Sequence, residues 1–479
     1  MIGRLSETND LLKVMESDQS EFIAVYGRRR IGKTFLINEI FHNNYAFHAA
    51  GIESGSKREQ LESFWESMKK QGLPKCKRPQ SWIKAFSLLE DLLSSLPDEK
   101  KVIFLDELPW FDTHKSGFLR AFENFWNGWC SLRKDIVLII CGSATTWIVK
   151  NILRARGGLH NRVTRQIPLA PFTLAECEEY AAYKKLNFNR QQLLECYMAL
   201  GGVAYYWSLL RPGLSAAQNF DALFFGRSTE MRDEYKTIFK SLFKSESKHM
   251  SVIRILGTRK IGMTRDELLA TLGESSGGDI STCLEELESC GFIRRYNPIG
   301  KSKKGAVYQL IDSYVLFYFE FLAHRTGNDE KYWTHHYSTP ATNTWRGLAF
   351  ERVCFWHIPQ IKAALGISGI ASDVYSWRGP SADPRAKTAQ VDMAIERADN
   401  TISICEIKFA TGDYELKKDE SRKIENQVES LSAALKRQRA VQTVLITPVG
   451  LKANLYSGTI QHVVTADQLF APESYCQRL

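Results

Sequence analysis

The chain has 479 residues, a length that predicts three domains at about 150 residues each. Apolar residues make up 44% of it and no stretch of about 18 uncharged apolar residues occurs, so the composition excludes a disordered chain and predicts no membrane span. Lysine and arginine number 63 against 54 aspartates and glutamates, and this net charge of +9 permits a polyanionic partner without requiring one.

The N-terminal segment is expected to belong to a globular domain. Residues 1–4, Met-Ile-Gly-Arg, begin no signal peptide, so we expect a cytoplasmic protein that binds no membrane. A helix with Leu11, Leu12, Val14 and Met15 follows.

Residues 21–41 predict a strand, a loop and the start of a helix. The loop, residues 27–34, has the pattern G-x-x-x-x-G-K-T between a strand and a helix, which is the context that a phosphate-binding loop requires. Its backbone N–H groups and the following helix N-terminus favour phosphate oxygens, and the alternative is a surface turn that happens to contain glycine and lysine. We expect ATP to bind this loop through Gly27, Arg28, Arg29, Arg30, Ile31, Gly32, Lys33 and Thr34.

A second strand supplies the acids that a nucleoside triphosphatase needs. Lys33 would reach the β- and γ-phosphates, and the Thr34 hydroxyl would bind Mg²⁺. The apolar run in residues 101–108, KVIFLDEL, ends in Asp106, a candidate for the Mg²⁺ shell, and Glu107, a candidate for orienting the attacking water. A helix N-cap is the alternative interpretation of this acidic pair.

A third apolar run, residues 136–141, ends at Gly-Ser-Ala-Thr. Ligands bind at the carboxyl ends of parallel strands, so Ser143 or Thr145 could sense the γ-phosphate, although a strand-ending turn explains the pattern nearly as well. The ten cysteines are scattered without a C-x-x-C pair, and Cys141 and Cys405 fall inside predicted strands. They are interpreted as small buried hydrophobes rather than as disulfides or zinc ligands.

The segment after Glu107 is unusually aromatic. Its large apolar side chains keep helical i, i+3, i+4 spacing, which predicts a core-facing helix rather than a platform for stacking bases. The residues concerned are Phe118, Ala121, Phe122, Phe125, Trp126 and Trp129.

The blocks IGRLSE, GRRRIGKT, FLDELPW, CGSAT, GGLHNR, LAPFTLAE and GGVAYYW lie between residues 2 and 207. With them the chain resembles prokaryotic AAA-type ATPases allied to the STAND class, archaeal and bacterial ATPases with an attached nuclease-like domain. The resemblance implies that Arg4 and Glu7 lie near the adenine. It also implies a helical lid, in which this chain has Ala204 where the family usually has proline; this departure bears on the adenine clamp.

Arg162, in GGLHNR, resembles the family's sensor arginine or arginine finger. Such a finger neutralises transition-state charge and is worth about 10³ to 10⁵ in rate. Acting in trans, it would require a homo-oligomer. Arg154, Arg156 and Arg165 are competing candidates, and a solvated basic loop is the alternative.

Residues 246–323 predict three helices and a β-ribbon, the order of a winged helix, which the family also carries at this position. The third helix would be the DNA-recognition helix, yet it has glutamates and no lysine or arginine: Glu285, Glu286 and Glu288. The wing is basic through Lys301, Lys303 and Lys304. We expect an intramolecular or self-assembly role for this module rather than specific DNA reading.

A polar linker, residues 324–342, precedes a β-hairpin. One strand carries Asp392, and the second, residues 401–409, carries Glu406 and Lys408 on the same face. These residues fit the D-x(n)-E-x-K signature of the PD-(D/E)XK nuclease fold, which the region resembles. Two carboxylates collect Mg²⁺ or Mn²⁺, and the lysine positions water or stabilises the developing anion.

Two further residues are candidates for the same site. Glu351 lies on an amphipathic helix where the nuclease fold often adds an acid, and Gln427 is a weaker candidate for orienting water or phosphate. The alternative interpretation of Glu406 and Lys408 is an ion pair on a solvated sheet edge. The apolar context favours the site, because carboxylates at a hydrophobic sheet need a metal or a partner.

The predicted architecture is α/β: a P-loop NTPase parallel sheet of AAA type with a helical lid, a winged helix, and a C-terminal restriction-endonuclease-like α/β domain. The predicted boundaries are residues 1–170 for the ATPase core, 171–245 for the lid, 246–323 for the winged helix, 324–342 for the linker and 343–479 for the nuclease-like domain.

The function predicted is Mg²⁺-dependent ATP binding and hydrolysis coupled to a metal-dependent nuclease acting on nucleic acid, DNA rather than RNA. One alternative is an ATP-dependent switch or assembly protein whose C-terminal fold binds nucleic acid or partners without cleavage. Another is a DNA-binding regulator, against which the acidic recognition helix argues.

Overall fold

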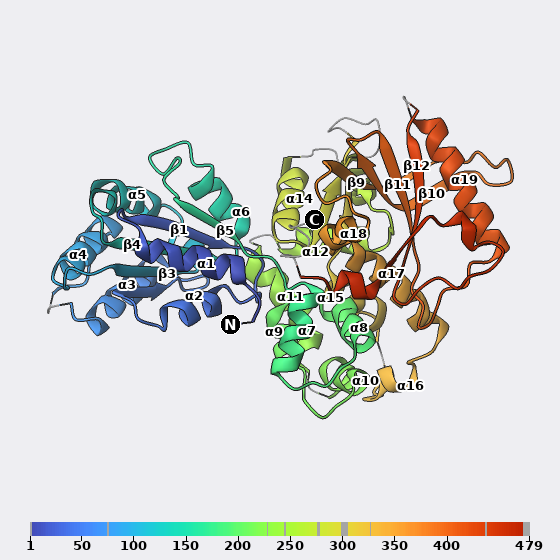
Figure 1. Ribbon diagram of the computed structural model, residues 1–479. Helices are drawn as coiled ribbons and strands as arrows, with labels where there is room; N and C mark the ends of the chain where they lie inside the picture. The colour runs from blue at the N-terminus through green and yellow to red at the C-terminus, as the bar shows by residue number, and fades with distance from the viewer. Residues whose placement is uncertain are drawn as a thin grey trace. The chain divides into compact units, whose positions relative to one another are not determined.

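The computed structural model describes residues 2–73, 76–227, 229–243, 246–274, 278–297, 305–325, 327–435 and 438–472. These residues form two compact units (Figure 1). The first comprises residues 1–171 and 240–244, and the second comprises residues 172–239 and 245–479. Within the described ranges, no helix has both the length and the apolar character needed to cross a membrane.

The first unit is built on a parallel five-stranded sheet in the order β2-β3-β4-β1-β5. The predicted strands are β1, β3 and β4, and β4 lies between the other two. β2 and β5 are four-residue strands at the two edges, too short to be recognised from periodicity. The bounds are Glu21–Tyr26, Phe47–Ala50, Lys101–Asp106, Ile136–Gly142 and Arg165–Pro168 for β1 to β5.

Alternation along the strands sends side chains to two separate cores. Phe22, Ile103 and Leu138 face one core, and their neighbours Ile23 and Phe104 face the other. The first core is covered by α3 (Lys57–Lys70), α4 (Trp82–Ser94) and α5 (Phe118–Gly128), and the second by α1 (Leu5–Lys13) and α2 (Lys33–Phe41). A short α6 (Thr145–Ile148) follows β4.

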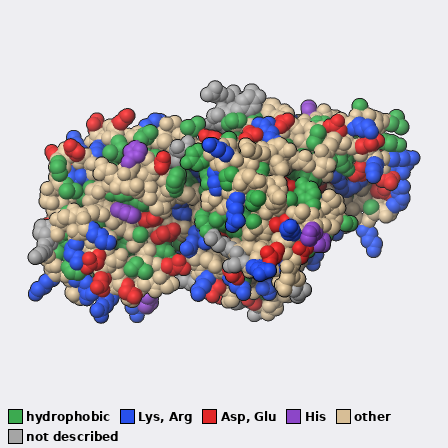
Figure 2. All heavy atoms as spheres, turned by 90° about the horizontal axis from the view of Figure 1, so that it is seen from below, with side chains coloured by type: hydrophobic (Ala, Val, Ile, Leu, Met, Phe, Trp, Pro, Cys, Tyr) green, Lys and Arg blue, Asp and Glu red, His purple; other side chains and the backbone are tan. Residues whose placement is uncertain are grey.

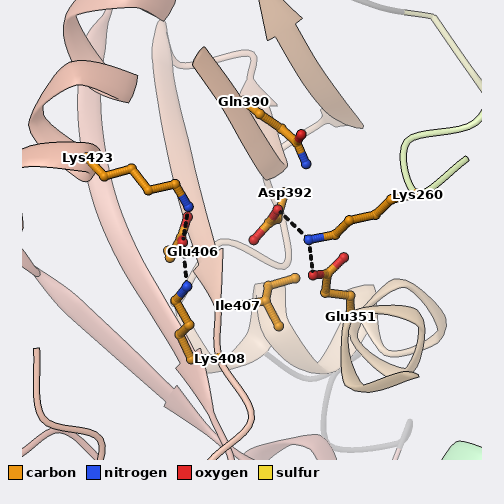
Figure 3. Close-up of a pocket in the computed structure, with 8 residues that line it drawn as sticks. All are labelled: Lys260, Glu351, Gln390, Asp392, Glu406, Ile407, Lys408 and Lys423. Carbon is orange, nitrogen blue, oxygen red and sulfur yellow. Dashed lines mark hydrogen bonds and ion pairs between the residues drawn. The ribbon is translucent and has the colours of Figure 1, made fainter. Parts of the chain in front are cut away.

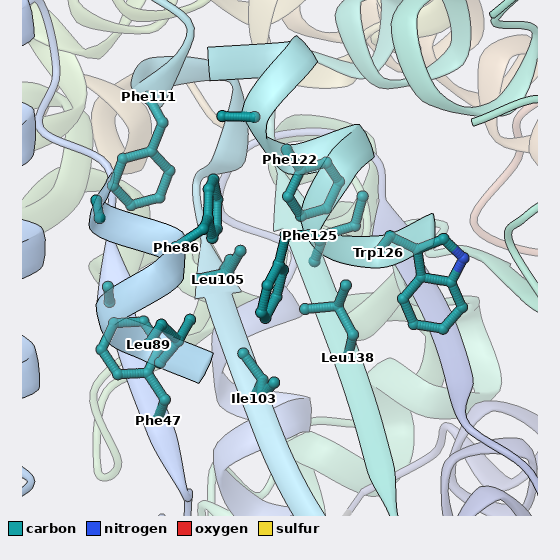
Figure 4. Close-up of a cluster of buried hydrophobic side chains, with 14 of the residues drawn as sticks. Phe47, Phe86, Leu89, Ile103, Leu105, Phe111, Phe122, Phe125, Trp126 and Leu138 are labelled. Carbon is teal, nitrogen blue, oxygen red and sulfur yellow. The ribbon is translucent and has the colours of Figure 1, made fainter. Parts of the chain in front are cut away.

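The aromatic segment is a core helix, as predicted. Phe118, Phe122 and Phe125 on α5 are fully buried, and Trp126 is 2% exposed. They pack with aromatic side chains from β1 and α4, so their rings are unavailable for stacking bases (Figure 4).

The second unit begins with short helices. They are α7 (Leu174–Tyr183), α8 (Arg190–Leu200), α9 (Ala204–Ser208), α10 (Ala216–Phe220) and α11 (Glu230–Leu242). From Leu193 to Leu200 every residue of α8 is buried. Ala204 starts α9 without the proline that the resembled family usually has there.

Three helices and then two antiparallel strands follow in the predicted order, and a two-residue strand that was not predicted lies between the first two helices. Thr264 and Glu267 form a capping box. The elements are α12 (Glu246–Gly257), β6 (Met263–Thr264), α13 (Arg265–Leu272), α14 (Gly278–Ser289), β7 (Ile293–Tyr296) and β8 (Val307–Leu310), with sheet order β6-β8-β7. The basic wing residues Lys301, Lys303 and Lys304 lie outside the described residues.

Residues 324–342, predicted as a linker, contain regular structure in the part that is described. The segment contains α16 (Tyr332–His335), and Trp333 there is fully buried among aromatic rings. The Asp221 carboxylate accepts a hydrogen bond from the Trp333 N–H at 2.8 Å. Thr339 of the segment caps α17 (Pro340–Trp356), because its hydroxyl accepts from the Thr342 N–H at 3.4 Å, and α15 (Ser313–Phe317) lies before the segment.

The last part of the unit is a five-stranded sheet in the order β13-β12-β11-β10-β9. The predicted hairpin is present, because β10 and β11 pair antiparallel, while β11, β12 and β13 are parallel. The strands are β9 (Ser372–Pro380), β10 (Thr388–Arg397), β11 (Thr401–Ile407), β12 (Ala440–Thr447) and β13 (His462–Thr465), with α18 (Ile358–Ala364), α19 (Lys418–Ala434) and α20 (Ala466–Leu469).

The cysteines are buried in both units. Cys141 in β4 and Cys405 in β11 are fully buried, as predicted, and of the nine cysteines in the described ranges only Cys76 is partly exposed. Burial raises the pKa of the Cys141 thiol well above its ordinary value and that of Cys405 to about 12. Both side chains are therefore protonated and apolar in character at neutral pH.

Candidate functional site

The phosphate-binding loop joins β1 to α2. Gly27 has φ +147°, and a Cβ there would overlap the carbonyl oxygen of Leu169, so the loop requires glycine at this position. Gly32, with φ +93°, starts α2. The buried Lys33 ammonium donates to the carbonyl oxygens of Gly27 at 3.0 Å and Arg28 at 2.8 Å, which holds it inside the loop.

The acids at the end of β3 meet this loop. The Thr34 hydroxyl donates to Asp106 Oδ2 at 3.0 Å, while Asp106 Oδ1 accepts from the Cys141 thiol at 2.5 Å and from the Glu107 N–H at 2.8 Å. Glu107 adopts φ +46°, a left-handed conformation that is uncommon for glutamate and turns the chain directly after β3. The structure thus brings Thr34 and Asp106 together as one oxygen-rich pair.

Ser143 connects the lysine to the second acid. Its hydroxyl accepts from Lys33 Nζ at 2.9 Å and donates to Glu107 Oε1 at 2.7 Å, and its N–H donates to Glu107 Oε2 at 3.0 Å. Lys33 is the first residue of α2, after the loop that follows β1, and Glu107 and Ser143 come directly after β3 and β4; the three strands lie side by side in the sheet. Of the two candidates after β4, it is Ser143 that contacts Lys33 and Glu107.

The other residues predicted for this site fall into two groups. Arg28, Arg30 and Ile31 belong to the loop itself, and Arg29 places Nη1 3.5 Å from Glu53. Arg4 is buried and donates to the Ala170 carbonyl at 2.6 Å, with Glu7 at 3.6 Å.

Arg162 lies at the end of an exposed turn of the first unit. Its side chain is exposed, and its Nε–H donates to the Gly158 carbonyl of its own turn at 3.4 Å. The competing arginines Arg154, Arg156 and Arg165 are also exposed.

The second candidate site is a pocket of about 230 Å³ in the second unit (Figure 3). It combines carboxylates with ammonium groups from several elements. Its lining consists of Lys260, Glu351, Gln390, Asp392, Glu406, Ile407, Lys408 and Lys423. All four residues that the D-x(n)-E-x-K interpretation and the amphipathic helix predicted, Glu351, Asp392, Glu406 and Lys408, therefore share one pocket.

A β-bulge sets the position of Asp392. Val391 pairs with Trp377 and Ala394 pairs with Tyr375, so Asp392 and the residue after it stand opposite the single residue Ser376. Bulges of this kind redirect a side chain relative to the regular alternation of a strand. On the other side of β10, Met393 pairs antiparallel with Cys405, and this register brings Asp392 opposite Glu406 on one face of the hairpin.

Glu406 receives three donors. Lys408 Nζ lies 3.0 Å from Oε1, Lys423 Nζ donates to Oε1 at 2.8 Å, and Gln427 Nε2 donates to Oε2 at 3.0 Å. The Gln427 amide also donates to the Gln390 carbonyl at 2.6 Å, which ties α19 to β10. Gln427 thus holds the carboxylate in place.

Glu351 and Asp392 share a different cation. Lys260 Nζ lies 2.6 Å from Glu351 Oε1 and 3.5 Å from Asp392 Oδ1. The side chains of the two acids are 7% and 8% exposed, whereas that of Lys260 is 40% exposed. The ammonium therefore reaches the acids from the solvent side.

Burial and neighbouring charges shift the pKa values of the three acids in different directions. Burial raises the pKa of Glu351 to about 7, with the charge of Asp392 adding to the shift, and it raises the pKa of Asp392, with Glu406 adding. Burial also opposes ionisation of Glu406, but the ammonium groups of Lys423 and Lys408 outweigh it and lower its pKa. Glu351 and Asp392 are the acids that need a cation beside them to remain charged.

The donor set suits a hard divalent cation with solvent ligands. In the part of the chain that the structure describes, no group of three or more His, Cys, Asp and Glu side chains is arranged to hold a metal ion by itself. Mg²⁺ commonly takes one or two protein carboxylates and completes its shell with water or phosphate oxygens. Asp392 with Glu406 or Glu351 fits such an ion.

Two lining lysines were missed by sequence reasoning. Lys423 lies one helical turn before Gln427 on α19, so the i, i+4 spacing could have identified it. Lys260 lies between α12 and β6, far in sequence from both acids that it contacts, and no local pattern marks it.

Residues 1–210 match the family described as an ATPase domain predominantly from Archaea. The uncharacterized protein MJECL04 of Methanocaldococcus jannaschii is 25% identical over 334 residues, which are 67% of this chain and 68% of that protein. The family match confirms a P-loop ATPase domain in the N-terminal part of the chain. It covers less than half of the chain, so the nuclease-like C-terminal domain stays a prediction.

Two solved structures resemble the chain distantly. The Walker-type ATPase PABY2304 of Pyrococcus abyssi has a TM-score of 0.45 at 14% identity, covering 66% of this chain and 95% of its own. The ORC2 protein of Aeropyrum pernix has a TM-score of 0.42 at 12% identity, covering 66% and 92%. At TM-scores below 0.5, neither likeness assigns a function.

Proposed function

We propose that the chain is an ATPase in which ATP binding and hydrolysis control a Mg²⁺-dependent phosphodiesterase that acts on nucleic acid. The observation that carries the second half is the convergence of Glu351, Asp392, Glu406 and Lys408 in one pocket, although they come from a helix and two strands. Metal-dependent phosphodiester chemistry uses one or two carboxylates as ligands of the ion, and this pocket offers such pairs beside a lysine.

The ATP half of the proposal follows from the contacts of the loop. Backbone N–H groups and Lys33 would bind the β- and γ-phosphates, and Thr34 and Asp106 would hold Mg²⁺, which would screen the phosphate charge. Glu107 orients the attacking water. Because Ser143 contacts both Lys33 and Glu107, a γ-phosphate that engages Lys33 would also alter the hydrogen bonding of Glu107.

In the C-terminal pocket, Asp392 and Glu406, with Glu351, hold Mg²⁺ or Mn²⁺. The ion, when bound, activates water near neutral pH and screens the phosphate charge. Lys408, 3.0 Å from Glu406, positions the water or stabilises the negative charge that develops on the phosphate. Lys260 and Lys423 add positive charge at the pocket, which favours a phosphodiester substrate.

The proposal of a nucleic-acid substrate depends on the lysines that line the pocket rather than on the charge of the protein surface as a whole. The face drawn in Figure 2 carries lysine and arginine interspersed with aspartate and glutamate. DNA is the expected substrate, and the experiment described below also includes RNA.

We interpret residues 246–323 as a winged helix with an intramolecular or assembly role. The order of its helices and strands supports this, and Glu286 of the acidic helix α14 pairs with His249 of α12 at 2.7 Å. An acidic face already engaged within the module is poorly suited to the phosphates of a major groove.

One observation favours the second candidate function, a nucleotide-dependent switch or assembly protein that does not cut. Each carboxylate of the pocket already has an ammonium partner from the same chain: Lys260 for Glu351 and Asp392, and Lys408 and Lys423 for Glu406. In this alternative the ion pairs hold the fold together, and the C-terminal part binds nucleic acid or a partner.

The test follows labelled single- and double-stranded DNA and RNA with Mg²⁺ or Mn²⁺, with and without ATP. The proteins are wild type, Lys33→Ala, the double variant Asp392→Ala/Glu406→Ala, and Asp373→Ala, which removes an exposed carboxylate of β9 as a matched control. We expect cleavage by wild type and Asp373→Ala only. Cleavage that persists in Lys33→Ala would mean two independent enzymes, and ATP hydrolysis without any cleavage would favour the switch.

A further inference from the structure

Lys260 comes to the C-terminal pocket from a different part of the fold than the other charged residues that line it. It lies in the turn between α12 and β6, within the predicted winged helix, whereas Glu351 lies on α17 and Asp392 on β10. Its ammonium joins these two acids, at 2.6 Å and 3.5 Å (Figure 3). A single cation thus connects two carboxylates that belong to different elements.

The backbone of Lys260 is fixed on two sides. Its carbonyl oxygen accepts from Gln309 Nε2 of β8 at 2.6 Å and from Arg352 Nη2 of α17 at 2.7 Å. The next carbonyl, that of Ile261, accepts from the Tyr296 hydroxyl at 2.7 Å. Side chains from β7, β8 and α17 therefore determine where the turn lies.

Gly262 closes the same turn. Its φ is +93°, and a Cβ there would overlap the carbonyl oxygen of Tyr308. Its N–H donates to the Arg259 carbonyl at 3.0 Å. A left-handed residue and a close backbone approach make the turn specific, so the placement of Lys260 follows from how the module is built rather than from a flexible surface loop.

Lys260 contacts carboxylate oxygens that a metal ion could also use as ligands. Glu351 and Asp392 are almost completely buried, and buried carboxylates need a cation or hydrogen-bond donors to stay charged. The same oxygens are the ligands that Mg²⁺ and Mn²⁺ prefer. An ammonium and a divalent ion repel each other, so the ammonium of Lys260 weakens the binding of an ion by this pair of acids.

We propose that Lys260 is an internal counter-ion that competes with a divalent metal ion for Glu351 and Asp392, so that the metal loads only when the lysine withdraws. This inference rests on the proposed metal-dependent function of the pocket. Because Gln309 and Tyr296 of the predicted winged helix hold the turn, whatever moves that module also changes access to the pocket. The winged helix then regulates the site through one side chain.

Mn²⁺ binding to the full chain, without nucleotide, tests the proposal by titration calorimetry and by the electron paramagnetic resonance signal of unbound Mn²⁺. The proteins are wild type, Lys260→Met, Lys260→Gln, Lys260→Arg and the control Arg259→Met, which removes the same charge from the exposed neighbour in the turn. Asp392→Asn/Glu406→Gln corrects for ions bound elsewhere on the chain. If the lysine leaves the acids in about a tenth of the molecules, its removal tightens Mn²⁺ binding about 10-fold.

We expect tighter binding in Lys260→Met and Lys260→Gln, and wild-type binding in Lys260→Arg and Arg259→Met. Thermal melting gives a second readout: without metal, Lys260→Met should melt below Arg259→Met, and Mn²⁺ should remove the difference. Equal or weaker Mn²⁺ binding in both neutral variants would overturn the role of Lys260 and leave the proposed function standing. No Mn²⁺ bound by the pocket of any variant would overturn both.

Discussion

His357 is a residue whose surroundings specify one protonation state. Its Nδ1 lies 2.8 Å from the Val353 carbonyl, and its Nε2 accepts the Leu174 N–H at 3.0 Å. The ring is therefore neutral with its proton on Nδ1. Burial lowers the pKa of His357 to about 4, because a second proton would be desolvated and would break the bond from Leu174.

This predicts an acid-sensitive stability. In the unfolded chain the pKa is about 6.5, so the folded state binds fewer protons than the unfolded state between about pH 4 and 6.5. The contribution of His357 is fully present above pH 6.5 and is lost as the pH falls, at up to about 1.4 kcal/mol per pH unit.

Denaturant unfolding of wild type and His357→Gln between pH 4 and 8 measures it. The pH slope of the free energy of unfolding should be smaller in His357→Gln than in wild type. The exposed His324→Gln should keep the wild-type slope. Equal slopes in all three proteins would remove His357 as a source of acid sensitivity.

At the scale of elements, α5 shows why patterns within one segment were reliable. Its apolar stripe predicted a buried face, and the buried residues Phe118, Phe122 and Phe125 lie on it. Strands β1, β3 and β4 were recognisable for the same reason, because a buried parallel strand is a continuous apolar run. β2 and β5 lacked this signal, since each has four residues at a sheet edge and β5 ends in proline.

The packing of α5 gives a prediction for stability. Phe125→Ala should lower the free energy of unfolding of the first unit by about 3 to 5 kcal/mol, because it removes a fully buried ring that stacks on Phe86 at 4.9 Å. Chemical denaturation followed by tryptophan fluorescence measures the change. Leu132→Ala, at a side chain that is 77% exposed, should change it by less than about 0.5 kcal/mol.

The C-terminal pocket contains residues that the sequence predicts and residues that it does not predict. Asp392, Glu406 and Lys408 were predicted because a hairpin brings nearby residues together with a period of two. Lys260 contacts acids that follow it by many residues, and only the tertiary fold brings them together. The polar composition of residues 324–342 predicted a linker for a related reason, because the burial of Trp333 there depends on aromatic rings from other segments, such as Phe220 and Phe321.

At the scale of the whole molecule, the arginine finger stays a prediction. Arg162 is exposed and bonded only weakly to its own turn, at 3.4 Å, so its side chain is accessible to a second copy of the chain. If it acts in trans, Arg162→Ala should lower ATP turnover by about 10³-fold or more without weakening ATP binding. The exposed Arg120→Ala, on α5, is the matched control.

Mixing experiments distinguish an arginine finger that acts in trans from ATP hydrolysis within a single chain. Adding inactive Glu107→Gln subunits to wild type should change ATP turnover non-linearly if neighbouring copies complete each other's sites. Strictly linear dilution would indicate that each chain hydrolyses ATP by itself, as a monomeric switch would.

The buried thiols make the two sheets separately observable. Cys141 lies in β4 of the first unit and Cys405 in β11 of the second, and both have raised pKa values. The thiolate is the form that attacks an alkylating reagent, so each side chain becomes reactive only while its strand is open to solvent. Pulsed alkylation read by peptide mass spectrometry would therefore record the opening rate of each sheet, with and without ATP, in one untagged sample.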